Sequence, residues 1–192
     1  MDEPNDAPSA DLIALAGRAA KASSGGAPVD TWDPPDCGRI DIRIAADGRW
    51  YHEGRLIGRE PLVRLFASIL KTEAGGATYL VTPVEKLRIE VEDAPFMAVE
   101  VVRTISPQGP VLTFRTNVGD LVTADAERPV HLPADIEEDF VPYLTVRGRL
   151  RAKASRAVAL ELAGWLEEDG EGYFLTSGGT RFEGPRSGER ER

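Results

Sequence analysis

The stretch GRLIGREPLVRLFASILKTEAGGATYLVT, residues 54–82, decides the fold, because a related stretch, GRLRAKASRAVALELAGWLEEDGEGYFLT, occupies residues 148–176. The two align without a gap at a constant offset of 94 residues and share seven of twenty-nine positions. Each copy has the same pattern, which predicts a strand, a helix, a Gly-containing loop and a strand in that order. We therefore predict an α+β protein made of two related halves that arose by internal duplication.

The residues around the first copy predict strands and one helix. Ile40, Ile42 and Ile44 alternate with polar residues, and the pair Asp47-Gly48 is a strong hairpin signal before a return strand. Pro61 suits the first turn of a helix with a core-facing stripe through Leu70, which Gly75-Gly76 would close.

The rest of the chain continues this pattern. From residue 78 to residue 123 the strands follow one another without a crossover helix, which predicts a mostly antiparallel sheet. A strand is expected over 143–150, a helix over 152–166 and a last strand over 173–176.

The N-terminus predicts a helical arm. A helix over about 10–22 follows Ser9 and carries an apolar stripe, and Ser23-Ser24-Gly25-Gly26 would end it as a linker. The stripe consists of Leu12, Ile13, Leu15, Ala16, Ala19 and Ala20. Such an arm packs either on its own body, which is the commoner case, or on a partner subunit, which would make a homo-oligomer.

The predicted organisation has four parts. They are an arm and linker over 1–29, whose first eight residues are loose; an N-terminal α+β half over 30–87; a C-terminal α+β half over 88–183; and a disordered charged tail over 184–192.

Composition limits the class of protein. The 192 residues include 42 % hydrophobic and 29 % charged residues, which suits a globular protein with a core. The net charge of −9 argues against bulk nucleic-acid binding, and no apolar run approaches the ~18 residues of a membrane helix. The acidic N-terminus does not read as a secretory signal, and Cys37 is the single cysteine, so we expect a cytoplasmic protein.

No cofactor motif is present. Two histidines and one cysteine without ligand spacing argue against a transition-metal site, and the sequence lacks a phosphate-binding Gly-rich loop. Cys37 has no base beside it in sequence, so a buried or half-buried structural cysteine is expected rather than a nucleophile paired with His52 or His131.

Several motifs in a fixed order resemble one bacterial family, the domain-of-unknown-function 1285 proteins. They span roughly Trp32 to Leu166 and include Cys37-Gly38, Ile40-Asp41-Ile42-Arg43-Ile44, Asp47-Gly48, Trp50, Leu80-Val81-Thr82-Pro83-Val84-Glu85-Lys86, Asp93-Ala94-Pro95-Phe96 and Phe114-Arg115-Thr116-Asn117-Val118-Gly119-Asp120. The resemblance implies a duplicated α+β core whose second half looks superficially like a pleckstrin-homology fold. It also implies a ligand site between the halves, for a nucleotide-like molecule, and a role in signalling, but no catalytic residue.

The repeat departs from itself at the start of each predicted helix. Gly58 faces Ala152 and Pro61 faces Ser155, so the two helix starts need not be equivalent.

A basic island is the clearest electrostatic feature of the sequence. No acidic residue falls between Asp139 and Glu161, and that interval carries Arg147, Arg149, Arg151, Lys153 and Arg156. The period of two places the first three on one face of a strand, and the last two at the following helix start, where anions bind well. The first copy has Arg55, Arg59 and Arg64 at the matching stage. The alternative is a solvated face paired with nearby carboxylates.

Asn117 and Asp120 add polar groups at a predicted hairpin turn. Asn117-Val118-Gly119 tolerates positive φ, so a simple turn explains it, whereas a functional turn would present both side chains to a ligand.

Three functions remain open. The first is a binding or signalling module that holds a small anionic, nucleotide-like ligand between the halves through Arg149, Arg151, Lys153, Arg156, Asn117, Asp120, Arg55 and Arg59. The second is a hydrolase or transferase that uses carboxylates there. The third is a structural module that docks a partner protein through the arm.

Overall fold

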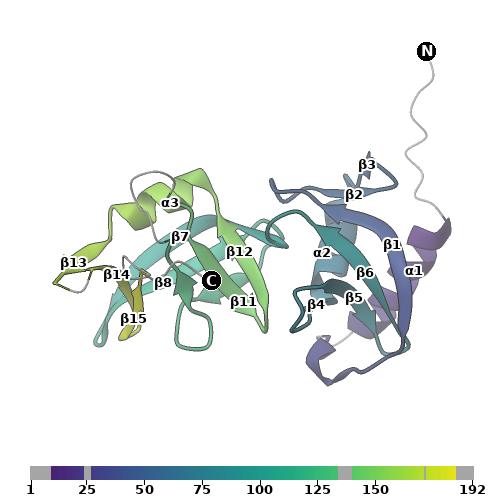
Figure 1. Ribbon diagram of the computed structural model, residues 1–192, viewed down its shortest axis with the longest axis horizontal. Coiled ribbons are helices and arrows are strands. Elements are labelled where there is room, and N and C mark those ends of the chain that lie inside the picture. Colours follow the sequence, from purple (N-terminus) through teal and green to yellow (C-terminus); the bar gives the residue numbers. More distant parts are fainter. Residues whose placement is uncertain (1–9, 24–26, 134–139, 171, 185–192) are drawn as a thin grey trace, which may run out of the picture. The chain divides into compact units, whose positions relative to one another are not determined.

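The structure is a computed structural model that describes residues 10–23, 27–133, 140–170 and 172–184. The predicted loose start over 1–8, residues 24–26 of the predicted linker and residues 185–192 of the predicted tail lie outside this described part. The chain divides into two compact units (Figure 1). Unit 1 comprises the described residues up to Arg43 and Trp50–Glu90, and unit 2 comprises Ile44–Arg49 and the described residues from Val91 onward.

The sheet of unit 1 has six strands in the order β3-β2-β1-β6-β5-β4. The strands are β1 (Asp36–Ile44), β2 (Trp50–His52), β3 (Arg55–Leu56), β4 (Leu70–Thr72), β5 (Thr78–Thr82) and β6 (Glu85–Val91). Backbone hydrogen bonds join Lys86 N to Pro35 O and Glu92 N to Ile44 O, so β1 and β6 run in the same direction. The predicted alternation in β1 is confirmed, since Ile42 and Ile44 are buried while Asp41 is exposed.

Two α-helices cover one face of this sheet, α1 (Ala10–Ser23) and α2 (Glu60–Ser68), and a short 3-10 turn, η1 (Val29–Thr31), lies between them in sequence (Figure 1). The Trp50 and Phe66 rings stack with centroids 6.4 Å apart, and both side chains are fully buried. The predicted arm helix is confirmed. Leu15 and Ala19 are fully buried, so α1 packs on its own unit, and Arg18 forms an ion pair with Glu85.

The predicted end of the second helix is wrong. α2 stops at Ser68, and Leu70 begins β4, which pairs with β5 through Leu70 and Leu80. Gly75-Gly76 therefore belong to the turn between β4 and β5. Leu70 and Leu80 are both fully buried, and this partner from a later part of the chain overrides the local helical pattern.

Unit 2 has a second six-stranded sheet in the order β10-β11-β12-β7-β8-β9. Its strands are β7 (Phe96–Ser106), β8 (Gly109–Thr116), β9 (Leu121–Thr123), β10 (Val130–His131), β11 (Tyr143–Arg147) and β12 (Leu150–Ala154). β12 and β7 are parallel, while the other neighbours are antiparallel. Helix α3 (Arg156–Ala163) packs on β7 and β12. A three-stranded sheet of β13 (Glu167–Asp169), β14 (Gly172–Ser177) and β15 (Thr180–Glu183) completes the unit.

The sequence misplaces two boundaries in unit 2. Gly148-Arg149 is a turn that separates β11 from β12, whereas the sequence predicts one strand over 143–150. The predicted helix over 152–166 begins later, at Arg156, because Ala152 and Ala154 pair with Phe96 and Ala98 of β7.

The predicted order of strand, helix, Gly-containing loop and strand is confirmed in both copies, each of which also has a strand between the helix and the loop that the sequence did not predict. β3, α2, β4 and β5 in unit 1 correspond to β12, α3, β13 and β14 in unit 2. The two stretches differ in their pairing, because β4 and β5 join the six-stranded sheet of unit 1, whereas β13 and β14 form a sheet with β15. The protein is therefore a mixed α+β chain with two six-stranded sheets, each with a packed helix. None of its described helices is long and apolar enough to span a membrane.

Candidate functional site

The prediction that Arg147, Arg149 and Arg151 of the basic island share one face of a strand is wrong. Arg149 lies in the β11–β12 turn and is exposed. The pairing of β11 with β12 shifts register between Thr145 and Arg147, so Thr145 faces Arg151 while Arg147 faces Leu150. Because paired residues point to the same side, the shift places Arg147 and Arg151 on opposite faces of the hairpin.

Two cations of the island are already bound within unit 2. Lys153 lies on β12, not at a helix start, and its Nζ is 2.6 Å from Asp93 Oδ2. The Tyr143 hydroxyl donates to the other oxygen of Asp93 at 2.8 Å. Arg147 lies 3.6 Å from Asp120 Oδ2 and also stacks over the Phe96 ring, 5.4 Å from its centroid. These contacts favour a paired surface over an open anion pocket at these positions.

The remaining cations of the island are dispersed. Arg149, Arg151 and Arg156 are exposed, and none forms an ion pair with a residue that the structure describes. Arg151 faces Thr145, whose hydroxyl lies 2.8 Å from His131 Nε2. Burial lowers the pKa of His131 below its ordinary value, and the positive charge of Arg151 lowers that pKa further. Anion binding by these arginines stays a prediction.

Asn117 binds the turn that contains Gly48, between β1 and β2, through its side-chain amide. Its Oδ1 accepts from Met97 N at 3.1 Å, and its Nδ2 donates to Gly48 O at 3.2 Å. Gly48 has φ +80°, and a Cβ on it would lie 2.9 Å from Asn117 Nδ2. The amide of Asn117 is therefore engaged with the backbone, while ligand binding by Asn117 and Asp120 stays a prediction.

Cys37 is exposed, although the sequence predicts a buried or half-buried side chain. The side chain is exposed in β1, and its thiol makes only a long contact of 3.7 Å with Pro35 O among the described residues. The prediction of a buried or half-buried cysteine is wrong, because the pattern of β1 turns this end of the strand to solvent.

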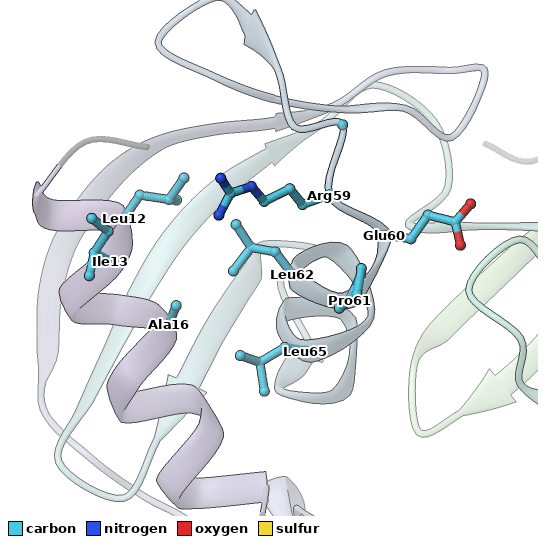
Figure 2. Close-up of a pocket in the computed structure, with 9 residues that line it drawn as sticks. Leu12, Ile13, Ala16, Arg59, Glu60, Pro61, Leu62 and Leu65 are labelled. Atoms are coloured by element: carbon cyan, nitrogen blue, oxygen red, sulfur yellow. The ribbon is translucent and has the colours of Figure 1, made fainter. Parts of the chain in front are cut away.

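Sequence reasoning missed a groove between α1 and α2 in unit 1, which we call the α1–α2 groove. It has a volume of about 710 Å³, and its walls are largely apolar (Figure 2). Its lining residues are Leu12, Ile13, Ala16, Gly58, Arg59, Glu60, Pro61, Leu62 and Leu65. All of them belong to unit 1.

The amphipathic pattern of both helices produces this groove. On α2, Phe66 and Ala67 are buried, which leaves the half-buried Leu62 and Leu65 on the side of α1. On α1, the buried Leu15 and Ala19 seat the helix, and the small Ala16 leaves space opposite Leu65 (Figure 2). The predicted stripe of α1 is wider than the part that the protein buries, since Ile13 remains 56 % exposed. An apolar stripe wider than the buried face of α1 is the sequence signal from which this groove could have been predicted.

Two charged residues, Arg59 and Glu60, lie at one end of the α1–α2 groove. Arg59, the residue before α2, extends its guanidinium over Leu62 toward α1, whereas Glu60 points away from α1 (Figure 2). Glu60 lies 3.3 Å from Arg64 one turn later, and Arg59 forms no ion pair with any described residue. Arg55, the other predicted site residue of unit 1, is exposed on β3 and does not line the groove.

These features define a two-unit α+β protein whose units each carry a six-stranded sheet, with an apolar groove in the first unit. The comparisons with known proteins agree with this class. The model of the DUF1285 N-terminal domain, a domain of unknown function, matches residues 27–94, and that of the DUF1285 C-terminal domain matches residues 95–183. The chain therefore belongs to the DUF1285 family, and the resemblance predicted from the sequence is confirmed.

Two solved structures are similar to this chain. A DUF1285 family protein from Silicibacter pomeroyi DSS-3 is 42 % identical with a TM-score of 0.81, and the match covers 94 % of this chain and 98 % of that protein. A DUF1285 family protein from Shewanella baltica OS155 is 31 % identical with a TM-score of 0.50, over 64 % of this chain and 90 % of that protein. The search of curated proteins found no match.

Proposed function

We propose that the protein is a binding module that holds a small, largely apolar ligand in the α1–α2 groove. The observation that carries this proposal is the groove itself, about 710 Å³ in volume with mostly apolar walls. Ligand pockets in proteins typically measure ~300–1,000 Å³ and combine an apolar lining with a few polar groups. The location replaces the basic island as the best-supported site, and a ligand between the two halves stays a prediction.

The chemistry of the lining favours binding over catalysis. Nucleophilic catalysis needs a nucleophile next to a base, and the lining residues include no Ser, Thr, Cys, Lys or His. Glu60 is the one carboxylate among them, and it points away from α1 and interacts with Arg64. A carboxylate-dependent reaction in this groove would therefore lack a free carboxylate that faces the ligand.

The same geometry supports a role in signalling. α1 supplies one wall of the groove, so a ligand that contacts both helices stabilises the docked position of α1. A ligand at 100 times its dissociation constant adds ~2.7 kcal/mol to that docked state. The fraction of molecules with α1 docked would then increase with ligand concentration, and a partner protein that binds only the docked or only the undocked state would respond to the ligand.

The test uses N-phenyl-1-naphthylamine, a neutral apolar probe whose fluorescence rises on binding. We expect saturable binding to the full chain, weakened in Ala16→Phe, which places a phenyl ring inside the groove, and kept in Ala14→Phe, the same change at an exposed position of α1. Circular dichroism of both variants checks that the fold is intact. Absent binding, or equal binding by the two variants, would refute the groove as the site.

A further inference from the structure

We propose that the ligand of the α1–α2 groove is an amphipathic carboxylate, namely a medium-length alkyl chain with one carboxylate at its end. The inference rests on the proposed function and adds the chemical class of the ligand. The carboxylate is placed at Arg59 and the alkyl chain between Leu12, Ile13, Leu62 and Leu65.

The position of Arg59 indicates where the charged end of the ligand lies. Its guanidinium lies at one end of the groove and no described residue pairs with it, while the other charged lining residue, Glu60, interacts with Arg64. A guanidinium presents two parallel N–H donors whose spacing fits the two oxygens of a carboxylate. Arg59 is exposed, so water occupies these donors in the free protein, and a carboxylate would replace that water with a charge-assisted pair of hydrogen bonds, which an uncharged alkyl chain could not form.

The surroundings of Arg59 favour a ligand with a single negative charge. The backbone N–H groups of Leu62 and Val63 donate to Arg59 O at 2.9 and 3.1 Å, so these amides of α2 are not available to a second anionic group. The nearest other cation on α2, Arg64, interacts with Glu60. One cation therefore faces the groove from α2, which matches a monoanion better than a phosphate dianion.

The apolar walls set the other end of the ligand. Leu62 and Leu65 on α2 face Leu12, Ile13 and Ala16 on α1, so an alkyl chain that enters from Arg59 meets side-chain carbon on both sides (Figure 2). Each methylene that leaves water on binding raises affinity about fourfold. Affinity should therefore increase with chain length until the groove is full and then level off.

The experiment displaces N-phenyl-1-naphthylamine from the full chain with hexanoate, octanoate, decanoate and dodecanoate, each below its micelle concentration, and with the methyl ester of each. We expect each acid to bind about two- to fivefold more tightly than its ester, because the Arg59 ion pair is exposed to solvent and such pairs contribute at most ~1 kcal/mol. Arg59→Leu should abolish that preference, Arg59→Lys should keep part of it, and Arg55→Leu, a matched change on the same unit, should leave it unchanged.

The outcomes separate the two claims. If the probe binds but acids and esters compete equally, the ligand class is wrong while the groove remains a binding site. If Arg55→Leu abolishes the preference as strongly as Arg59→Leu, the placement of the carboxylate at Arg59 is wrong. If the neutral probe itself fails to bind, the proposed function fails first.

Discussion

Gly48 lies at a point where the backbone of one hairpin approaches two side chains, and Gly48→Ala tests that contact. The residue has φ +80°, and an added Cβ would lie 2.9 Å from Asn117 Nδ2 and 3.0 Å from Met97 Cγ. The left-handed backbone costs a non-glycine residue ~1–2 kcal/mol. Overpacking adds ~1–3 kcal/mol, because the side-chain amide is held by two hydrogen bonds. We expect Gly48→Ala to destabilise unit 2 by ~2–5 kcal/mol.

Gly119→Ala is the control for the backbone term. Gly119 has φ +94°, but a Cβ there would have no atom within 4 Å, so this variant should show the conformational cost of ~1–2 kcal/mol alone. Both glycines belong to unit 2, which makes the comparison direct.

Hydrogen exchange of the amides in β7 and β8 is the assay, because it reports the free energy of opening for unit 2 even if unit 1 unfolds separately. Asn117→Ala in the Gly48→Ala background should cost less than the sum of the single changes, since it removes the closest atom of the clash. Equal costs for Gly48→Ala and Gly119→Ala, or strict additivity in the double variant, would show that the close contact does not determine stability.

Three further predictions concern other parts of the fold. The pKa of His131 is lower in the folded protein than in the unfolded chain, so as the pH falls the unfolded chain takes up a proton on His131 before the folded protein does. The contribution of His131 to the free energy of unfolding should therefore be fully present above pH ~6.5 and decrease as the pH falls from there toward the native pKa. His131→Gln should flatten this part of a denaturation–pH series, and Arg151→Gln should raise the His131 pKa in an NMR titration. Trp50→Phe should lower the free energy of unfolding in urea by less than ~1.5 kcal/mol, because it keeps the stack on Phe66 and removes an indole N–H that has no partner among the described residues. Trp50→Ala should lower it by ~3–5 kcal/mol, and equal costs of the two variants would contradict this account. Cys37 should react with a thiol reagent in the native state as fast as in the unfolded state, and Cys37→Ser should change stability by less than ~0.5 kcal/mol; a protected thiol would contradict its exposure.

The sequence predicts those elements whose signals are local. The alternation at Ile42 and Ile44 and the turn at Asp47-Gly48 depend on neighbouring residues only, and β1 and β2 form where these signals place them. The arm helix is equally local, since a stripe at helical spacing and a Gly-containing linker are enough to define it.

Features that depend on distant partners could not be predicted in the same way. Leu70 continues the helical pattern of α2 but pairs with Leu80, and Ala152 joins a strand because Phe96 lies beside it. The register shift that separates Arg147 from Arg151 is a property of the pairing between two strands. The period-two pattern of Arg147, Arg149 and Arg151 contains no information about that shift, so it predicts one shared face.

The difference between the two copies of the repeat falls where we place the ligand. α3 has a capped start, because the Ser155 side chain accepts a hydrogen bond from Val158 N at 3.3 Å. α2 begins at Glu60, its N-cap residue Arg59 forms no side-chain cap, and Pro61 lies in its first turn. Gly58, Arg59, Glu60 and Pro61 all line the α1–α2 groove. The N-cap position of α2 is thus Arg59, which lines the groove, where α3 has the capping Ser155. The start of α2 lacks this stabilising cap at the residue where we place the ligand's carboxylate, so it suits ligand binding more than helix stability.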